Sequence, residues 1–283
     1  MSECRTYRGR IAPTPSGQLH IGHARTFHIA HERARSAAGK LVLRIEDLDS
    51  ARCKDEYSRQ MMADLEWLGI RWDEGPDRCG AFGPYVQSLR IEHYLKAWKR
   101  LEEAGVIYPS PHSRKDVELA LSAPHEGEGE PVFPVELRPA TARRADAPSG
   151  MNWRFRVPDG ESVRFVDECA GEQEFVAGKD FGDFLVWRKD GWPSYELAVV
   201  VDDAEMQISE VVRGADLLLS TARQLLLYKA LGWTAPRFFH CPLVRDAEGR
   251  RLAKRSAGLS VAKLREEGFS SEKVLALANT RMG

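Results

Sequence analysis

Short apolar segments alternate along the first part of the chain with longer segments in which apolar residues recur at helical spacing. The short segments, 7–12 and 40–47, predict strands. The first is stopped by Pro13 and Pro15, and the second ends in carboxylates. The longer segments predict helices, each closed by a glycine, a common residue just past a helix C-terminus. These helices cover 21–39, 54–69 and 88–105. The alternation of strands and helices predicts an α/β fold with a parallel sheet.

The pattern changes after the third predicted helix. Prolines, glycines and charges dominate 108–150, which predicts a loop-rich insertion. Alternating apolar residues at 152–168 predict a small antiparallel hairpin, and 181–203 is expected to supply strands that return to the main sheet. The segment 209–232 predicts a strand, a turn and a helix.

Length and charge exclude few functions. The 283 residues suffice for one large domain or two modest ones, and the formal net charge of −1 gives no global basic field. Local basic clusters do occur, at 138–144 and 250–255. The chain has no apolar signal segment and no run of about 18 apolar residues. Its 5 cysteines lack paired spacing. We therefore expect a soluble cytoplasmic protein that does not bind membranes.

Two histidines lie three residues apart at the start of the first predicted helix. His20 and His23 should share one helix face, with Gly22 between them. A helix N-terminus offers unpaired N–H groups and a positive dipole end, so imidazole donors beside it suggest a phosphate site. The alternative is a pair of surface or core histidines without a ligand.

Polar side chains also follow three predicted strands. Arg10 and Thr14 flank the end of the first strand, and Glu46 follows the second. Arg213 follows a later strand, with Tyr195 one strand earlier. The carboxyl ends of parallel strands form the usual ligand crevice. Two arginines, a carboxylate and a phenol could hold an amino acid with an additional acid group, because the arginine fork binds carboxylates with two hydrogen bonds. A structural ion-pair network is the alternative.

Four segments, in this order, resemble the class I aminoacyl-tRNA synthetases of the glutamyl type. They are RIAPTPSGQLHIGHART, LRIEDLD, DGWPSYELAVVVDDAEMQISEVVRGADLLLSTARQLLL and RRLAKRS. The first resembles the family signature R-x-A-P-S-P-T-G-x-L-H-x-G, and the last is a loose form of the K-M-S-K-S loop. The resemblance implies an α/β fold with a Rossmann-like parallel sheet, a loop-rich insertion and a short C-terminal helical stub.

The resemblance also assigns the glutamate-binding residues. Arg10 and Arg213 would hold the two carboxylates of the substrate, in an order that the sequence does not fix. Glu46 would meet the α-ammonium group and Tyr195 the carboxylate end. The remaining residues would line the same pocket through backbone atoms and a hydroxyl; they are Ile11, Ala12, Pro13 and Thr14.

ATP would bind at the HIGH segment. His20 and His23 would contact the phosphates, and Gly22 would let the adenine approach the backbone. Lys254 would neutralise charge as pyrophosphate leaves, with Mg²⁺ accompanying ATP. Arg251 and Ala253 replace the lysine and serine that are usual in this loop.

A full-length glutamyl-tRNA synthetase continues into helical domains that read the anticodon, whereas this chain ends at residue 283. We expect no anticodon-binding domain here, because the remaining segment is too short for another core. We expect a catalytic domain in two halves, which cover 1–107 and 181–243. The insertion between them covers 108–180, and the loop with the C-terminal stub covers 244–283.

These features resemble the truncated paralogues, the glutamyl-queuosine tRNA(Asp) synthetases. The resemblance implies activation of L-glutamate to glutamyl-adenylate by ATP without tRNA. Glutamate is then transferred to the queuosine base in the anticodon loop of tRNA(Asp). Two alternatives remain: a catalytic fragment that charges the 3′ end of tRNA(Glu), and a non-catalytic regulator that binds glutamate or tRNA.

Zinc is not expected. Many relatives hold zinc through a Cys-x-Cys pair, a tyrosine and another cysteine, but here Ser110 and His112 occupy the pair positions. His112 and His125 with carboxylates are the remaining candidate ligands. We expect the insertion to fold around an apolar nucleus, and the protein to be a monomer.

Overall fold

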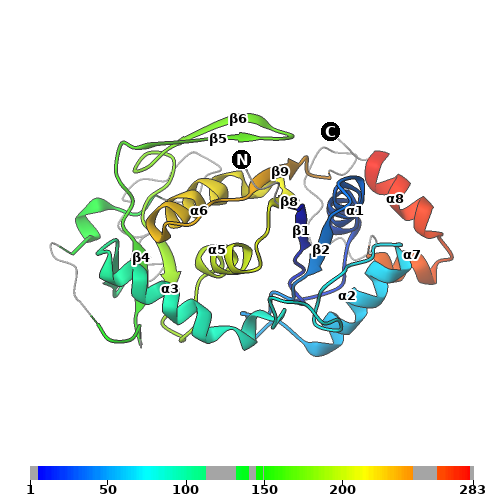
Figure 1. Ribbon diagram of the computed structural model, residues 1–283, viewed down its shortest axis with the longest axis horizontal. Coiled ribbons are helices and arrows are strands. Elements are labelled where there is room, and N and C mark those ends of the chain that lie inside the picture. The colour runs from blue at the N-terminus through cyan, green and yellow to red at the C-terminus, as the bar shows by residue number, and fades with distance from the viewer. Residues whose placement is uncertain (1–5, 113–131, 140–144, 149, 245–259, 281–283) are drawn as a thin grey trace.

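The computed structural model describes residues 6–112, 132–139, 145–148, 150–244 and 260–280 (Figure 1). Its first unit is a parallel pair of strands, β1 (Arg8–Ile11) and β2 (Lys40–Leu43). The helix α1 (Ile21–Ser36) connects them. The predicted strand–helix–strand order is confirmed, although β2 ends before the polar residues that were expected to continue it.

A second parallel pair lies beside the first. It consists of β8 (Glu210–Gly214) and β9 (Arg237–Cys241), which are joined through α6 (Leu218–Leu231). The Ser209 N–H donates to the Arg8 carbonyl oxygen at 2.9 Å, so β8 starts next to β1, and Figure 1 shows β1, β8 and β9 together. The carboxyl ends of these strands therefore meet at one edge, as expected for a ligand crevice.

The other predicted helices are confirmed with ends shifted by a few residues. They are α2 (Asp55–Trp67) and α3 (Ile91–Glu103). Two further helices, α7 (Val261–Glu266) and α8 (Ser271–Thr280), follow near the end of the chain, and Figure 1 shows α8 beside α1. Within the described ranges, no helix combines the length and apolar character that crossing a bilayer requires. The described residues also contain three short 3₁₀ helices, which cover Gln87–Leu89, Val135–Leu137 and Ala215–Leu217.

The predicted hairpin at 152–168 is wrong in its pairing. The strand β4 (Asn152–Phe155) lies between β3 (Ile107–Ser110) and β7 (Phe184–Trp187) in an antiparallel sheet. Its aromatic side chains cause this placement, because the Trp153 ring packs edge-on to Trp98 and the Phe155 ring stacks on Phe184.

The strand that follows β4 along the chain forms the hairpin instead. This hairpin joins β5 (Ser162–Asp167) to β6 (Gly171–Val176), and its β5 end lies against β9. The Glu168 N–H donates to the Phe238 carbonyl oxygen at 2.9 Å. This contact links the end of the hairpin to β9 of the second parallel pair.

The prediction that 181–203 supplies strands that return to the main sheet is also wrong, because its strand β7 pairs with β4 in the antiparallel sheet. Apart from β7, the segment forms the helix α5 (Tyr195–Glu205), which begins where the Ser194 hydroxyl accepts a hydrogen bond from Leu197 N–H. The helix is buried on nearly all sides, so its apolar residues form a continuous valine-rich run instead of a stripe. Such a run is typical of a buried strand as well, and periodicity alone does not separate the two.

Candidate active site

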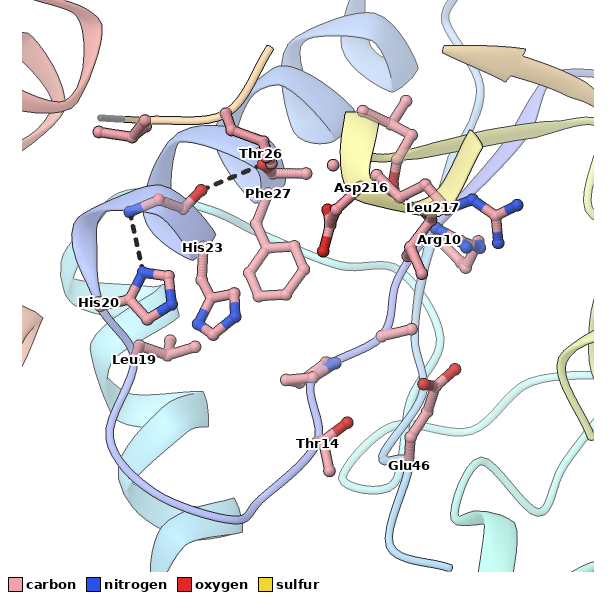
Figure 2. A pocket seen from close by; sticks show the side chains of 18 of the residues that line it. Arg10, Thr14, Leu19, His20, His23, Thr26, Phe27, Glu46, Asp216 and Leu217 are labelled. Atoms are coloured by element: carbon pink, nitrogen blue, oxygen red, sulfur yellow. Dashed lines mark hydrogen bonds between the residues drawn. The ribbon is translucent and has the colours of Figure 1, made fainter. Parts of the chain in front are cut away.

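A cavity of about 670 Å³ opens where the carboxyl ends of β1 and β8 meet the start of α1. Figure 2 shows His20 and His23 on one side of it, with Arg10 and Glu46 on the other. Most of the predicted site residues line this one cavity, and they come from segments far apart in the chain. They are Arg10, Ala12, Pro13, Thr14, His20, Gly22, His23, Glu46, Tyr195 and Arg213.

Two predicted site residues are not placed at the cavity. Ile11 does not line it, because its side chain is fully buried in the core and its carbonyl oxygen accepts from Arg44 N–H at 3.0 Å. The alternating directions of side chains along β1 explain why Arg10 faces the cavity and Ile11 does not. Lys254 lies outside the described residues.

The histidines form the start of α1. His20 is the N-terminal capping residue, and its Nδ1 accepts a hydrogen bond from Gly22 N–H at 3.2 Å. The rings of His20 and His23 stack, with centroids 3.8 Å apart, as expected for residues that share a helix face. With Nδ1 as acceptor, a neutral His20 carries its proton on Nε2 and presents a donor there. Together with the positive end of α1, this arrangement suits an anion.

Gly22 has a steric role in this arrangement. A Cβ at this position would lie 3.0 Å from Cε1 and 3.1 Å from Nδ1 of the His20 ring. Both distances are shorter than ordinary van der Waals contacts, so a larger residue would push the ring out of its capping position. The glycine therefore lets the histidine ring lie directly over the first turn.

Arg10 is 4% exposed and lies at the end of β1. Its Nη1 donates to the Val212 carbonyl oxygen at 3.0 Å, and its Nε lies 3.4 Å from Oδ1 of Asp203 on α5. These contacts hold the guanidinium between β8 and α5, where it borders the cavity.

Glu46 follows β2 and is held by a buried arginine. Arg44 Nη2 donates to Glu46 Oε1 at 3.0 Å, and Arg44 Nη1 donates to Asp203 Oδ1 at 2.6 Å. Burial raises the pKa of Glu46 despite the nearby guanidinium groups of Arg44 and Arg10. A buried carboxylate of this kind favours a cationic partner, since an ammonium group would restore its charged form.

Arg213, on β8, also lines the cavity and is 5% exposed. Its Nε donates to His240 Nε2 at 3.0 Å, its Nη2 to Thr221 Oγ1 at 2.7 Å, and its Nη1 contacts the Tyr195 hydroxyl at 3.5 Å. A guanidinium has five N–H groups. Among the described contacts, therefore, two N–H groups of Arg213 are left for an acceptor in the cavity.

Several cavity residues were not predicted from the sequence. Asp216 and Leu217 follow β8, and Thr26 and Phe27 follow the HIGH segment on α1 (Figure 2). Thr26 Oγ1 donates to the Gly22 carbonyl oxygen at 3.1 Å. Helical spacing from His23 could have indicated Phe27, but nothing local marks Asp216. The supporting residues Arg44, Asp203 and His240 were also missed, because their partners are distant in sequence.

Groups of metal-ligating side chains that lie close together are few among the described residues. Ser110 is buried and His112 lies near Phe133, while His125 is outside the described residues. Where the structure can be described, one group brings three candidate ligand atoms within 4.8 Å of one another: His28, His31 and Glu32, on α1. This group does not line the cavity.

Comparisons with known proteins agree on one family. Residues 6–283 match the family described as class I tRNA synthetases (E and Q), catalytic domain. A glutamyl-Q tRNA(Asp) synthetase of Symbiobacterium thermophilum is 48% identical over 274 residues, which cover 94% of this chain and 84% of that protein. A glutamate–tRNA ligase of Sulfurihydrogenibium is 40% identical, but the match covers only 56% of its length.

A solved structure has the same fold. It is a glutamate tRNA ligase from Elizabethkingia meningosepticum in complex with its amino acid. The TM-score is 0.83 at 28% sequence identity, and the match covers 97% of this chain and 60% of that one.

Proposed function

The chain belongs to the class I glutamyl and glutaminyl tRNA synthetases, and within them to the glutamyl-Q tRNA(Asp) synthetases; from this premise we propose that it activates L-glutamate with ATP and transfers it to queuosine in tRNA(Asp). The family prediction made from the sequence is confirmed, and ATP use follows from membership of this catalytic family.

One observation carries the proposal at the level of residues. A single cavity combines two buried guanidinium groups and a buried carboxylate with the histidine-capped start of a helix. The first three groups are complementary to an amino acid with two carboxylates and one ammonium group. The helix start is complementary to phosphates. We assign the carboxylates to Arg10 and Arg213, and the α-ammonium group to Glu46.

The reaction requires two steps and no covalent enzyme intermediate. First, an oxygen of the glutamate α-carboxylate attacks the α-phosphorus of ATP, the bond to the β-phosphate oxygen breaks, and pyrophosphate leaves. During this step His20 and His23 contact the phosphate oxygens, and Lys254 stabilises the charge that develops on pyrophosphate. ATP enters as its Mg²⁺ complex, in which the ion neutralises part of the phosphate charge.

In the second step, a hydroxyl of the queuosine cyclopentene ring attacks the carbonyl carbon of glutamyl-adenylate. An ester forms, the mixed anhydride breaks and AMP leaves with the bonding electrons. The hydroxyl proton is released. The protein contributes orientation, because the adenylate is held between the arginines and the helix start.

The first step has a direct test. Pyrophosphate exchange into ATP should proceed with glutamate, ATP and Mg²⁺ alone, since the cavity already contains groups for both substrates. Exchange that appears only after tRNA is added would contradict activation without tRNA. Absence of exchange under both conditions would favour the non-catalytic alternative.

A further inference from the structure

A chain of hydrogen bonds extends from Arg213 away from the cavity. Arg213 and His240 are directly paired in the register of β8 and β9. Arg213 Nε lies 3.0 Å from His240 Nε2, and His240 Nδ1 lies 2.6 Å from Oδ2 of Asp167. All three residues are at most 5% exposed. A carboxylate on the β5–β6 hairpin is thereby connected to a guanidinium that lines the cavity.

The Asp167 carboxylate is held by the backbone. Its Oδ1 accepts from Cys169 N–H at 3.0 Å and from Ala170 N–H at 2.7 Å, and both oxygens lie 3.1 Å from His240 N. Burial opposes ionisation, but the hydrogen bonds from Ala170 and His240 outweigh it and lower the pKa of Asp167. The group is therefore an ionised acceptor in a fixed orientation.

The hydrogen-bond chain determines which nitrogen of His240 carries the proton. Burial and the charge of Arg213 lower the pKa of His240 to about 4, so the ring is neutral near pH 7. Asp167 accepts only, which places the imidazole proton on Nδ1. Nε2 is then an acceptor and faces Arg213 Nε, which can only donate. Thr221 Oγ1, 3.0 Å from the same Nε2, accepts from Arg213 Nη2 and donates to the Leu217 carbonyl oxygen.

We propose that Asp167 and His240 are positioning residues, which fix the orientation in which Arg213 presents its remaining N–H groups to a substrate carboxylate. This inference rests on the proposed function, because it names the residues behind a substrate-binding arginine. A guanidinium on a long side chain has many rotamers, and an acceptor in the right place selects one of them. The β5–β6 hairpin then contributes to substrate binding without touching the cavity.

Asp167→Asn tests this chain with almost no change in shape. The Cys169 and Ala170 N–H groups require an acceptor at the Oδ1 position, so the amide oxygen should occupy it. The amide NH₂ then replaces Oδ2 and donates to His240 Nδ1. The imidazole proton moves to Nε2, where it opposes the N–H of Arg213. Loss of one hydrogen bond to a charged group should raise the KM for glutamate roughly 10- to 100-fold, with the KM for ATP unchanged.

Two substitutions of His240 distinguish the roles of its two ring nitrogens. His240→Asn retains a polar group near Nδ1 and removes the acceptor at Nε2, so it should raise the KM for glutamate as Asp167→Asn does. His240→Gln carries an acceptor near the Nε2 position and should recover most of the affinity. Glu168→Gln, next to Asp167 on the same hairpin, is the matched control and should change neither KM.

The measurements are pyrophosphate exchange kinetics and the ¹⁵N chemical shifts of the His240 ring. We expect a neutral ring protonated on Nδ1 in the wild type and on Nε2 in Asp167→Asn. A wild-type ring protonated on Nε2 would overturn the proposal. So would variants that change both KM values equally, or neither, since such results indicate a purely structural role. If the wild type shows no glutamate-dependent exchange, the proposed function fails, and the ring spectra alone decide the proton position.

Discussion

Replacing Arg213 with alanine is expected to remove most of the preference for glutamate over glutamine. The guanidinium is almost completely buried, and its described hydrogen-bond partners are His240, Thr221 and the Tyr195 hydroxyl at 3.5 Å. A substrate carboxylate in the cavity would complete its hydrogen bonds and balance its charge. The neutral amide of glutamine does neither, and its NH₂ group would face N–H donors.

The size of the effect follows from the burial of the pair. Leaving one partner of a buried ion pair unmatched costs roughly 3–5 kcal/mol. At 1.36 kcal/mol per factor of ten, this corresponds to about two to four powers of ten in kcat/KM between glutamate and glutamine. Arg213→Ala should lose most of this ratio, mainly by reducing the activity with glutamate.

The assay is pyrophosphate exchange with each amino acid, for the wild type, Arg213→Ala and Glu46→Gln. Glu46→Gln is the matched comparison, because it alters the group proposed to meet the ammonium that both amino acids share. It should reduce both activities and preserve their ratio. If Arg213→Ala leaves the glutamate-to-glutamine ratio unchanged, Arg213 does not read the side-chain carboxylate, and Arg10 must provide the discrimination.

Three further predictions concern the other parts of the site. Lys254→Ala should slow adenylate formation by on the order of 100- to 1000-fold and change glutamate binding little, as measured by single-turnover kinetics; equal losses in both would indicate a structural loop. Because burial raises the pKa of Glu46 above its ordinary value of 4.5, Glu46 should become protonated above that pH on acidification, which weakens glutamate binding. Calorimetry should therefore show a glutamate affinity that begins to fall above pH 4.5 as the pH is lowered, and Glu46→Gln should remove this fall. Purified protein should contain no stoichiometric zinc by elemental analysis, and about one zinc per chain would point to His112 and His125.

The helices α1, α2 and α3 were predictable because local chemistry specifies them. They have periodic apolar positions and end near glycines, and the strands on either side of α1, β1 and β2, are short apolar runs. α5 was misread because a helix buried on nearly all sides shows no polar face. β4 was misassigned because its aromatic residues pack against Trp98 and Phe184, which are distant in sequence.

The site residues also divide into those marked by the local sequence and those set by contacts distant in the sequence. Arg10 lies near the end of β1, Glu46 follows β2, and His20 and His23 lie at the start of α1. Each was therefore marked by its local position, and the resemblance to the glutamyl-type synthetases joined them in one predicted site. The groups that orient them are different. His240 acts on Arg213 through a strand pairing that the apolar pattern did not indicate, and its other partner, Asp167, comes from the β5–β6 hairpin. Long-range hydrogen bonds of this kind have no local sequence signal.

The most direct test of the account follows labelled glutamate into tRNA. The protein should be incubated with ATP and with tRNA from cells that contain or lack queuosine, and the labelled tRNA then cleaved with nuclease. We expect label only in queuosine-containing tRNA(Asp), on the fragment that carries the anticodon loop. Label at the 3′ end of tRNA(Glu), independent of queuosine, would contradict the proposed function and show that the chain is a charging enzyme.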